Sequence, residues 1–114
     1  MYALFLILND VYMLDEVHEV FYECEVGATT MDSVGLGKVL LEHNINMMLF
    51  TSVRRILEGD KPYNKTIISV IREEEKLNEV VKKIQKKLGD LSKPGVGFMF
   101  VVPVLDIYGF KNEE

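Results

Sequence analysis

Two short glycine-containing segments are the residues of this sequence best suited to hold a ligand. Gly35-Leu36-Gly37-Lys38 follows a β-branched stretch, and residues 93–97 have the sequence Lys-Pro-Gly-Val-Gly. Glycine lets the backbone approach a ligand closely, neighbouring N–H groups can surround an anion, and a lysine neutralises phosphate charge. Neither segment is a P-loop, and two ordinary turns would give the same pattern, so each segment alone is weak evidence of binding.

Histidine, cysteine and serine residues do not form a catalytic or metal-binding pattern. His18 and Cys24 are six residues apart, which does not place them on one face of a helix, and His43 lies far from both. No CxxC, HxxxH, HExxH or GxSxG motif occurs. We therefore expect no metal site and no enzymatic activity, with Cys24 as a small core residue and His18 near the surface.

Composition argues against several classes of protein. The chain has 114 residues, with 13 Lys+Arg against 18 Asp+Glu and a net charge of −5, whereas a nucleic-acid binder normally carries a basic stripe. The single cysteine cannot form an intrachain disulfide and does not indicate an oxidising compartment. The longest apolar run, residues 98–105, is far shorter than the roughly 20 residues of a membrane helix, and the apolar N-terminus lacks the basic residues of a secretion signal. We expect one cytoplasmic domain, residues 1–114, that does not insert into a membrane.

Hydrophobic periodicity predicts four strands and two helices. Short apolar or β-branched runs indicate strands at residues 3–8, 28–34, 65–71 and 98–104. Apolar residues three or four positions apart indicate helices at residues 14–24 and 77–88, and a glycine follows each. Two strand–helix–strand units in this order predict an α+β fold, a ferredoxin-like βαββαβ sandwich. It has a four-stranded antiparallel sheet, two helices on one face, and a long loop between the second and third strands.

The sheet face that the helices leave uncovered is expected to need a partner. This face carries residues such as Tyr2, Leu4 or Met99, depending on the register of the strands. A large apolar face exposed to water usually marks an interaction site, and a chain of this length has no further element to cover it. We therefore expect a homo-oligomer in which one sheet packs against another.

The connection between the second and third strands, residues 38–64, is long for a compact domain and rich in apolar residues. It includes a short helical pattern at residues 51–57. Two hypotheses stay open: the segment protrudes and meets a partner protein, or it packs on its own subunit or a neighbour. Arg54 and Arg55 suit an anionic ligand or partner, although a solvated basic turn explains them equally well. Residues 62–64, Pro-Tyr-Asn, are typical of a turn before the third strand.

Taken together, several segments resemble the PII signal-transduction proteins, a family of nitrogen regulators. The matching segments follow the family's order along the whole chain: residues 14–17 (Leu-Asp-Glu-Val), 27–30 (Gly-Ala-Thr-Thr), 34–38 (Val-Gly-Leu-Gly-Lys) and 95–104. The long connection occupies the place of the family's T-loop. The resemblance implies a ferredoxin-like homotrimer without enzymatic activity. It also implies a regulator that senses a small ligand, such as an adenine nucleotide, in clefts between subunits.

The resemblance further implies which residues bind. The ligand-binding positions carried over are Thr29, Gly35, Leu36, Gly37, Lys38, Gly95, Val96 and Gly97. The T-loop-like segment would engage a partner protein, such as a membrane transporter or an enzyme. Its partner-binding residues would be Met48, Phe50, Arg54 and Arg55.

The sequence departs from the family where charge is expected. Val96 replaces the family's Asp, Phe98 replaces its phosphate-binding Lys, and residues 104–110 contain no arginine. A charged hydrogen bond contributes about 1.5–3 kcal/mol, so we expect weaker ATP binding than is usual in the family. Two alternatives stay open: a trimeric scaffold that needs no ligand, and a CutA-like protein of the same broad fold that binds a divalent metal.

Overall fold

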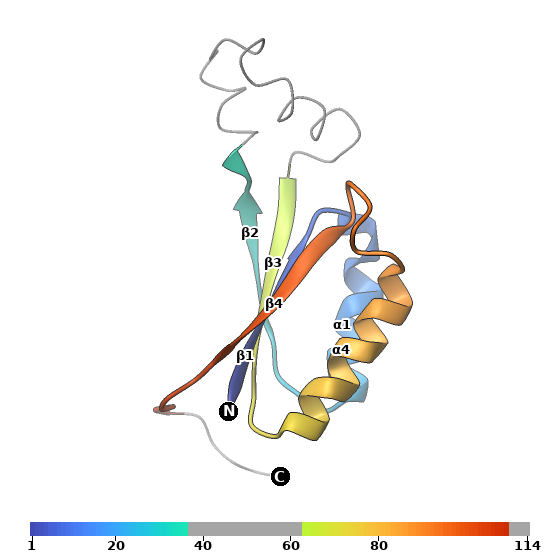
Figure 1. Ribbon diagram of the computed structural model, residues 1–114. Helices are drawn as coiled ribbons and strands as arrows, with labels where there is room; N and C mark the ends of the chain where they lie inside the picture. Colours follow the sequence, from blue (N-terminus) through green and yellow to red (C-terminus); the bar gives the residue numbers. More distant parts are fainter. Residues whose placement is uncertain (37–62, 110–114) are drawn as a thin grey trace.

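The computed structural model describes residues 1–36 and 63–109. Four strands form one antiparallel sheet in the order β2-β3-β1-β4: β1 is Tyr2–Leu8, β2 is Thr29–Val34, β3 is Tyr63–Ile71 and β4 is Gly97–Pro103. A 3-10 turn, η1 (Val11–Met13), leads into helix α1 (Leu14–Glu23), and helix α4 (Glu74–Leu88) connects β3 to β4. Both helices lie on the same face of the sheet (Figure 1). This arrangement confirms the α+β, ferredoxin-like prediction.

The charges of α4 suit the helix dipole at both ends, and those of α1 suit it at the N-terminal end. Acidic residues occupy the first turn of α1 and of α4, and Lys86 and Lys87 occupy the last turn of α4. Gly89 ends α4 with a positive φ of 77°, and its N–H donates to Gln85 O at 2.9 Å. A left-handed glycine that satisfies a terminal carbonyl is a common way to stop a helix, so the sequence signal and the structure agree here.

The hydrophobic core lies between the sheet and the two helices. Leu4, Leu6 and Leu8 of β1 are fully buried, as are Ile67 of β3 and Cys24 just after α1. The helix residues that complete this core are Val17, Val20, Phe21, Leu77, Val80 and Ile84. The burial of Cys24 confirms its expected role as a small core residue.

The uncovered sheet face is apolar, but its residues differ from the examples expected from the sequence. Tyr2, Leu4 and Met99 all pack on the helix-covered side, so assigning them to the opposite face was wrong. Because side chains alternate along a strand, their neighbours face outward instead. We call this surface the open face; its larger apolar residues are Phe5, Ile7, Met31, Ile68, Val70, Phe98, Phe100 and Val102.

The third strand also begins earlier than the sequence suggested. Tyr63 and Asn64, expected in a turn, are the first residues of β3 and pair with Val34 and Ser33 of β2. Within the described part of the chain, no helix has the length and apolar character needed to cross a membrane. The helical pattern expected at residues 51–57 lies outside the described residues.

Candidate functional site

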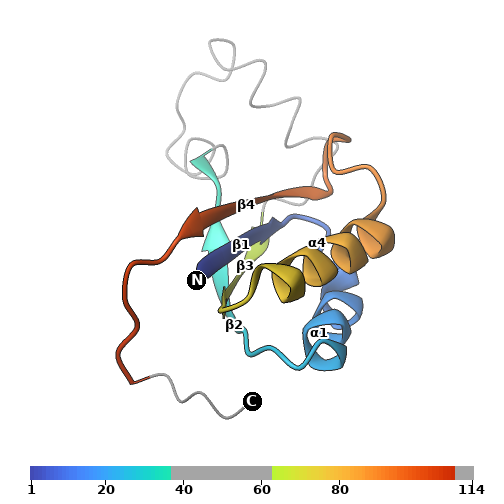
Figure 2. The same cartoon turned by 60° about the horizontal axis from the view of Figure 1, so that its bottom comes forward.

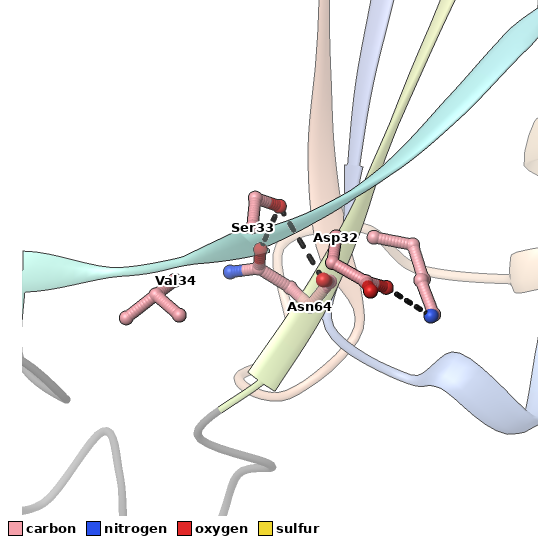
Figure 3. A pocket seen from close by; sticks show the side chains of 5 residues that line it. Asp32, Ser33, Val34 and Asn64 are labelled. Carbon is pink, nitrogen blue, oxygen red and sulfur yellow. Dashed lines mark hydrogen bonds and ion pairs between the residues drawn. The ribbon is translucent and has the colours of Figure 1, made fainter.

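An open hollow of about 580 Å³ lies where β2 ends and β3 begins (Figure 3). The described residues that line it are Asp32, Ser33, Val34, Asn64 and Lys65. They come together because β2 and β3 are antiparallel, with Asp32 opposite Lys65 and Ser33 opposite Asn64. Strand alternation places Ser33 and Asn64 on the open face and directs Asp32 and Lys65 to the other face.

Ser33 is the centre of a small hydrogen-bond cluster. Its hydroxyl donates to Asn64 Oδ1 and lies 3.3 Å from Asn64 O, as Figure 3 shows. Ser33 Oγ also lies 2.8 Å from Thr66 Oγ1. A hydroxyl has one proton to donate, so when Ser33 donates to Asn64, the Thr66 hydroxyl is the donor to Ser33. The cluster is partly buried and therefore holds the Asn64 side chain in a defined orientation.

The charged pair beside this cluster is neutral overall. Lys65 Nζ donates to Asp32 Oδ1 directly across the two strands. The Asp32 side chain is largely exposed, and an exposed pair of this kind contributes only about 0–1 kcal/mol to stability. Lys65 is the one described lysine that lines the hollow, and the Asp32 carboxylate already neutralises its charge. The pair therefore adds no net positive charge that could attract an anionic ligand.

These residues are suited to binding rather than to catalysis. Ser33 hydrogen-bonds to an amide oxygen and to another hydroxyl, and neither group is a base that could remove its proton at neutral pH. A bound molecule would therefore meet hydroxyl and amide groups with no net charge. Such a surface fits an uncharged hydrogen-bonding group of a ligand, whereas a triphosphate needs several cations.

The glycine turn before β4 has a structural explanation of its own. Gly97 has φ 140°, and a Cβ there would lie 2.3 Å from Ile7 O, so only glycine fits. Gly95 also has a positive φ, 84°. The Val96 carbonyl accepts hydrogen bonds from the N–H groups of Asn9 and Asp10, at 3.0 and 3.2 Å. The fold therefore requires a glycine at Gly97 whether or not a ligand binds there.

A single chain does not bring the predicted ligand positions together. Gly35 and Gly97 lie toward the same end of the sheet but on its opposite edge strands, three strand spacings or about 14 Å apart across the sheet. Gly97 is in register with Asp32, so Gly35 also lies three residues, about 10 Å, further along the strands. Thr29 starts β2, about 20 Å of extended chain from Gly35. Leu36 follows Gly35 and is exposed, whereas Gly37 and Lys38 lie outside the described residues, as do Met48, Phe50, Arg54 and Arg55.

The backbone conformation requires glycine at Gly97 but not at Gly35. Among the described residues, a Cβ at Gly35 would have one neighbour within 4 Å, Asn64 Nδ2 at 4.0 Å. This distance places the Asn64 amide beside Gly35, so the predicted glycine segment lies next to the Ser33 cluster, although Gly35 itself does not line the hollow. The structure thus links one of the two predicted segments to residues that the sequence did not single out.

Two further titratable side chains that the sequence singled out, His18 and Cys24, belong to the helix layer. His18 Nε2 lies 2.7 Å from Thr30 Oγ1, which joins the exposed side of α1 to the edge strand β2. Burial, followed by the nearby Glu79 carboxylate, raises the pKa of the Cys24 thiol. Among residues 1–36 and 63–109, no group of three or more His, Cys, Asp or Glu side chains could hold a metal ion.

Sequence reasoning missed Ser33, Asn64 and Thr66 because their proximity depends on the pairing of β2 with β3. Hydrophobic periodicity does not set that register when a long segment separates the two strands. One signal was present: Asp32 and Lys65 have opposite charge, as directly paired cross-strand residues often do. Testing trial registers for this pair would have placed Ser33 opposite Asn64.

Comparison with known proteins adds support for the fold. No protein-family model matches the sequence, and no curated protein matches it significantly. Among solved structures, the chain is similar to one described as a functionally unknown protein from Pediococcus pentosaceus ATCC 25745. The sequence identity is 18%, the similarity covers 96% of each chain, and the TM-score is 0.61. At this identity, the similarity concerns the fold alone.

Proposed function

We propose that this chain forms a PII-like, non-enzymatic regulatory homotrimer that binds a small ligand between subunits and acts through a partner protein. The fold supports this proposal, because the PII resemblance implied the ferredoxin-like arrangement of strands and helices. The observation that carries the proposal is the open face, which is apolar, broad and uncovered within the described chain.

The open face has the character of a subunit contact. Phe98 is 55% exposed, Phe100 42% and Val102 37%, all on one edge strand. Phe5 and Phe100 stack with ring centroids 4.9 Å apart, and Phe98 and Phe100 lie 6.2 Å apart. Contiguous aromatic and aliphatic surface of this kind is stabilised when a second protein removes it from water. Sheet-to-sheet packing of copies of this chain covers it.

Assembly would also bring the two predicted parts of the ligand site together. One chain keeps the hollow beside Gly35 and the turn at Gly97 on opposite edges of the sheet, so a site that uses both needs two copies. In the proposed site, Asn64 and Ser33 bind an uncharged hydrogen-bonding group, such as the base of an adenine nucleotide. Backbone N–H groups of the partner's glycine turn bind its anionic part.

The partner-binding part of the proposal rests on the sequence. Residues 38–62 lie outside the described part of the chain. The candidates for partner binding therefore come from composition and resemblance; they are Met48, Phe50, Arg54 and Arg55. A cytoplasmic location and a transporter or enzyme as partner are proposals of the same origin.

The assembly is tested by sedimentation equilibrium of the purified chain. We expect a trimer at micromolar concentration, and dissociation in Phe100→Asp, because a carboxylate on the open face must be desolvated in the contact. Tyr22→Asp is the matched control, since Tyr22 is an exposed aromatic residue on α1 and its variant should remain trimeric. A wild-type chain that sediments as a monomer would refute the proposal.

Ligand binding is tested by titration calorimetry with AMP, ADP and ATP on the same trimer. We expect heat from at least one nucleotide, and an affinity at least about tenfold lower in Asn64→Ala, which loses the amide beside Gly35. Asn78→Ala, an exposed position on α4, is the control. A trimer that gives no heat with any nucleotide would favour the scaffold that needs no ligand.

A further inference from the structure

Another hollow, with a volume of about 420 Å³, lies between α1 and α4. Figure 1 and Figure 2 both show these two helices side by side on one face of the sheet. The described residues that line the hollow are Val20 and Glu23 of α1 and Lys83, Lys86 and Lys87 of α4. We call it the lysine hollow. Because the helices lie opposite the open face, the lysine hollow stays accessible when copies of the chain pack through that face.

Helical spacing brings the three lysines together on one side of α4. Lys83 and Lys86 are three residues apart, and Lys83 and Lys87 are four apart, so their side chains are neighbours on the helix surface. Like charges at these spacings repel one another. An anion placed among the three ammonium groups relieves this repulsion, which favours binding of an anion at this position.

The carboxylates near the lysine hollow compensate its positive charge only in part. Lys83 Nζ lies 3.4 Å from Glu79 Oε2, and Lys87 Nζ lies 3.9 Å from Glu19 Oε1. Both pairs are solvent-exposed and therefore weak, so a multivalent anion can compete with them for the two lysines. None of the ion pairs found within residues 1–36 and 63–109 involves Lys86. Lys86 is therefore the lysine whose charge is most available to a ligand.

The acidic side chains of α1 restrict the ligand to a small anion. Helix α1 has four acidic residues and no lysine or arginine, whereas residues 82–88 of α4 include four lysines and no acidic residue. An extended acidic peptide or an anionic membrane surface that covered the lysines would also meet the carboxylates of α1, and like charges repel. A small anion inside the lysine hollow meets the carboxylate of Glu23 alone, against three lysines.

We propose that the lysine hollow binds a small multivalent anion of the phosphate class, such as pyrophosphate or a phosphorylated small molecule. A lysine ammonium is a compact charge on a flexible stem, and it is a common ligand of phosphate groups. Three such stems from one side of α4 can converge on one compact anion, beside the buried side chain of Val20. This site lies in the helix layer, apart from the Ser33–Asn64 cluster, and it does not depend on the proposed function.

The test is a titration of the full chain with sodium pyrophosphate at low ionic strength, followed by two-dimensional NMR of the backbone amides. Signals of residues 20–23 and 83–87 should shift in a saturable manner, and added sodium chloride should weaken binding by screening. Lys86→Gln should raise the dissociation constant at least about fivefold. Lys82→Gln is the matched control: it makes the same charge change on α4 outside the lysine hollow and should stay within about twofold of wild type.

The outcomes separate this site from the proposed nucleotide site. Absence of saturable shifts in α1 and α4 would overturn the inference and leave the proposed function untouched. Shifts confined to the glycine turn before β4, weakened by Lys93→Gln and not by Lys86→Gln, would also overturn it, because pyrophosphate would then occupy the nucleotide site. Equal weakening by Lys82→Gln and Lys86→Gln would refute it as well, since binding would then follow the overall charge of α4.

Discussion

Replacing Gly97 by alanine tests whether this glycine is required by the fold before any ligand is considered. An added Cβ would lie 2.3 Å from Ile7 O and 3.2 Å from Leu8 Cα, and the backbone has φ 140°. Side chains rarely adopt this conformation, and holding one there costs about 1–3 kcal/mol. The overlap with Ile7 O must be relieved in addition, because a Cβ and a carbonyl oxygen do not approach so closely.

The loss of stability depends on how the overlap between the added Cβ and Ile7 O is relieved. Gly97 and Leu8 form the last pair between β4 and β1, so the strands can separate at this end. Separation sacrifices the two hydrogen bonds that Asn9 and Asp10 donate to Val96 O, each contributing about 0.5–1.5 kcal/mol. Together with the backbone strain, we expect Gly97→Ala to lower the free energy of unfolding by about 2–6 kcal/mol.

The assay is urea unfolding followed by circular dichroism at one fixed protein concentration, with Gly35→Ala as the control. Within residues 1–36 and 63–109, a Cβ at Gly35 would meet only Asn64 Nδ2 at 4.0 Å, so the alanine variant should stay within about 1 kcal/mol of wild type. Equal stability of the two variants would refute the reasoning. If Gly35→Ala folds normally, it also becomes a clean probe of ligand binding at the hollow.

Two further predictions concern ionisable side chains of the helix layer. The hydrogen bond from Lys83, followed by the charge of Lys76, holds the pKa of the Glu79 carboxyl below its ordinary value of 4.5. A lowered pKa stabilises the folded state above pH 4.5, so Glu79→Gln should be less stable than wild type at pH 7. This difference should disappear as the pH falls below 4.5 toward the folded-state pKa, and urea midpoints measured from pH 7 to pH 3 check it. Burial and the Glu79 carboxylate raise the pKa of Cys24, so a thiol reagent at pH 8 should label it only after denaturant is added.

The strands and helices could be predicted because each leaves a local pattern in the sequence. The stripe from Leu77 to Leu88 has helical spacing, lysines near its end and a glycine stop, and α4 is found there. The strand of residues 65–71 was recognised from its β-branched residues, although the structure adds Tyr63 and Asn64. Proline and asparagine in the Pro62-Tyr63-Asn64 segment suggested a turn, but the pairing of Tyr63 and Asn64 with β2 extends the strand instead.

The orientation of the sheet could not be predicted, for a definite physical reason. Every residue from Ala3 to Leu8 is apolar, so both possible alternations look equally suited to the core. The choice depends on packing: Leu4, Leu6 and Leu8 meet the helices, and Phe5 and Ile7 are left on the open face. The Ser33–Asn64 cluster was missed for a related reason, because it exists only in one register of β2 and β3.

A single carbonyl joins the turn before β4 to the start of the helix layer. Val96 O accepts the amide protons of Asn9 and Asp10, and these residues lead through η1 into α1. Two segments distant in sequence are thus held together by one acceptor, and a substitution that displaces the Val96 carbonyl also removes two hydrogen bonds at the entrance to η1 and α1. The position of α1 on the sheet therefore depends in part on the conformation of a turn almost ninety residues later in the chain.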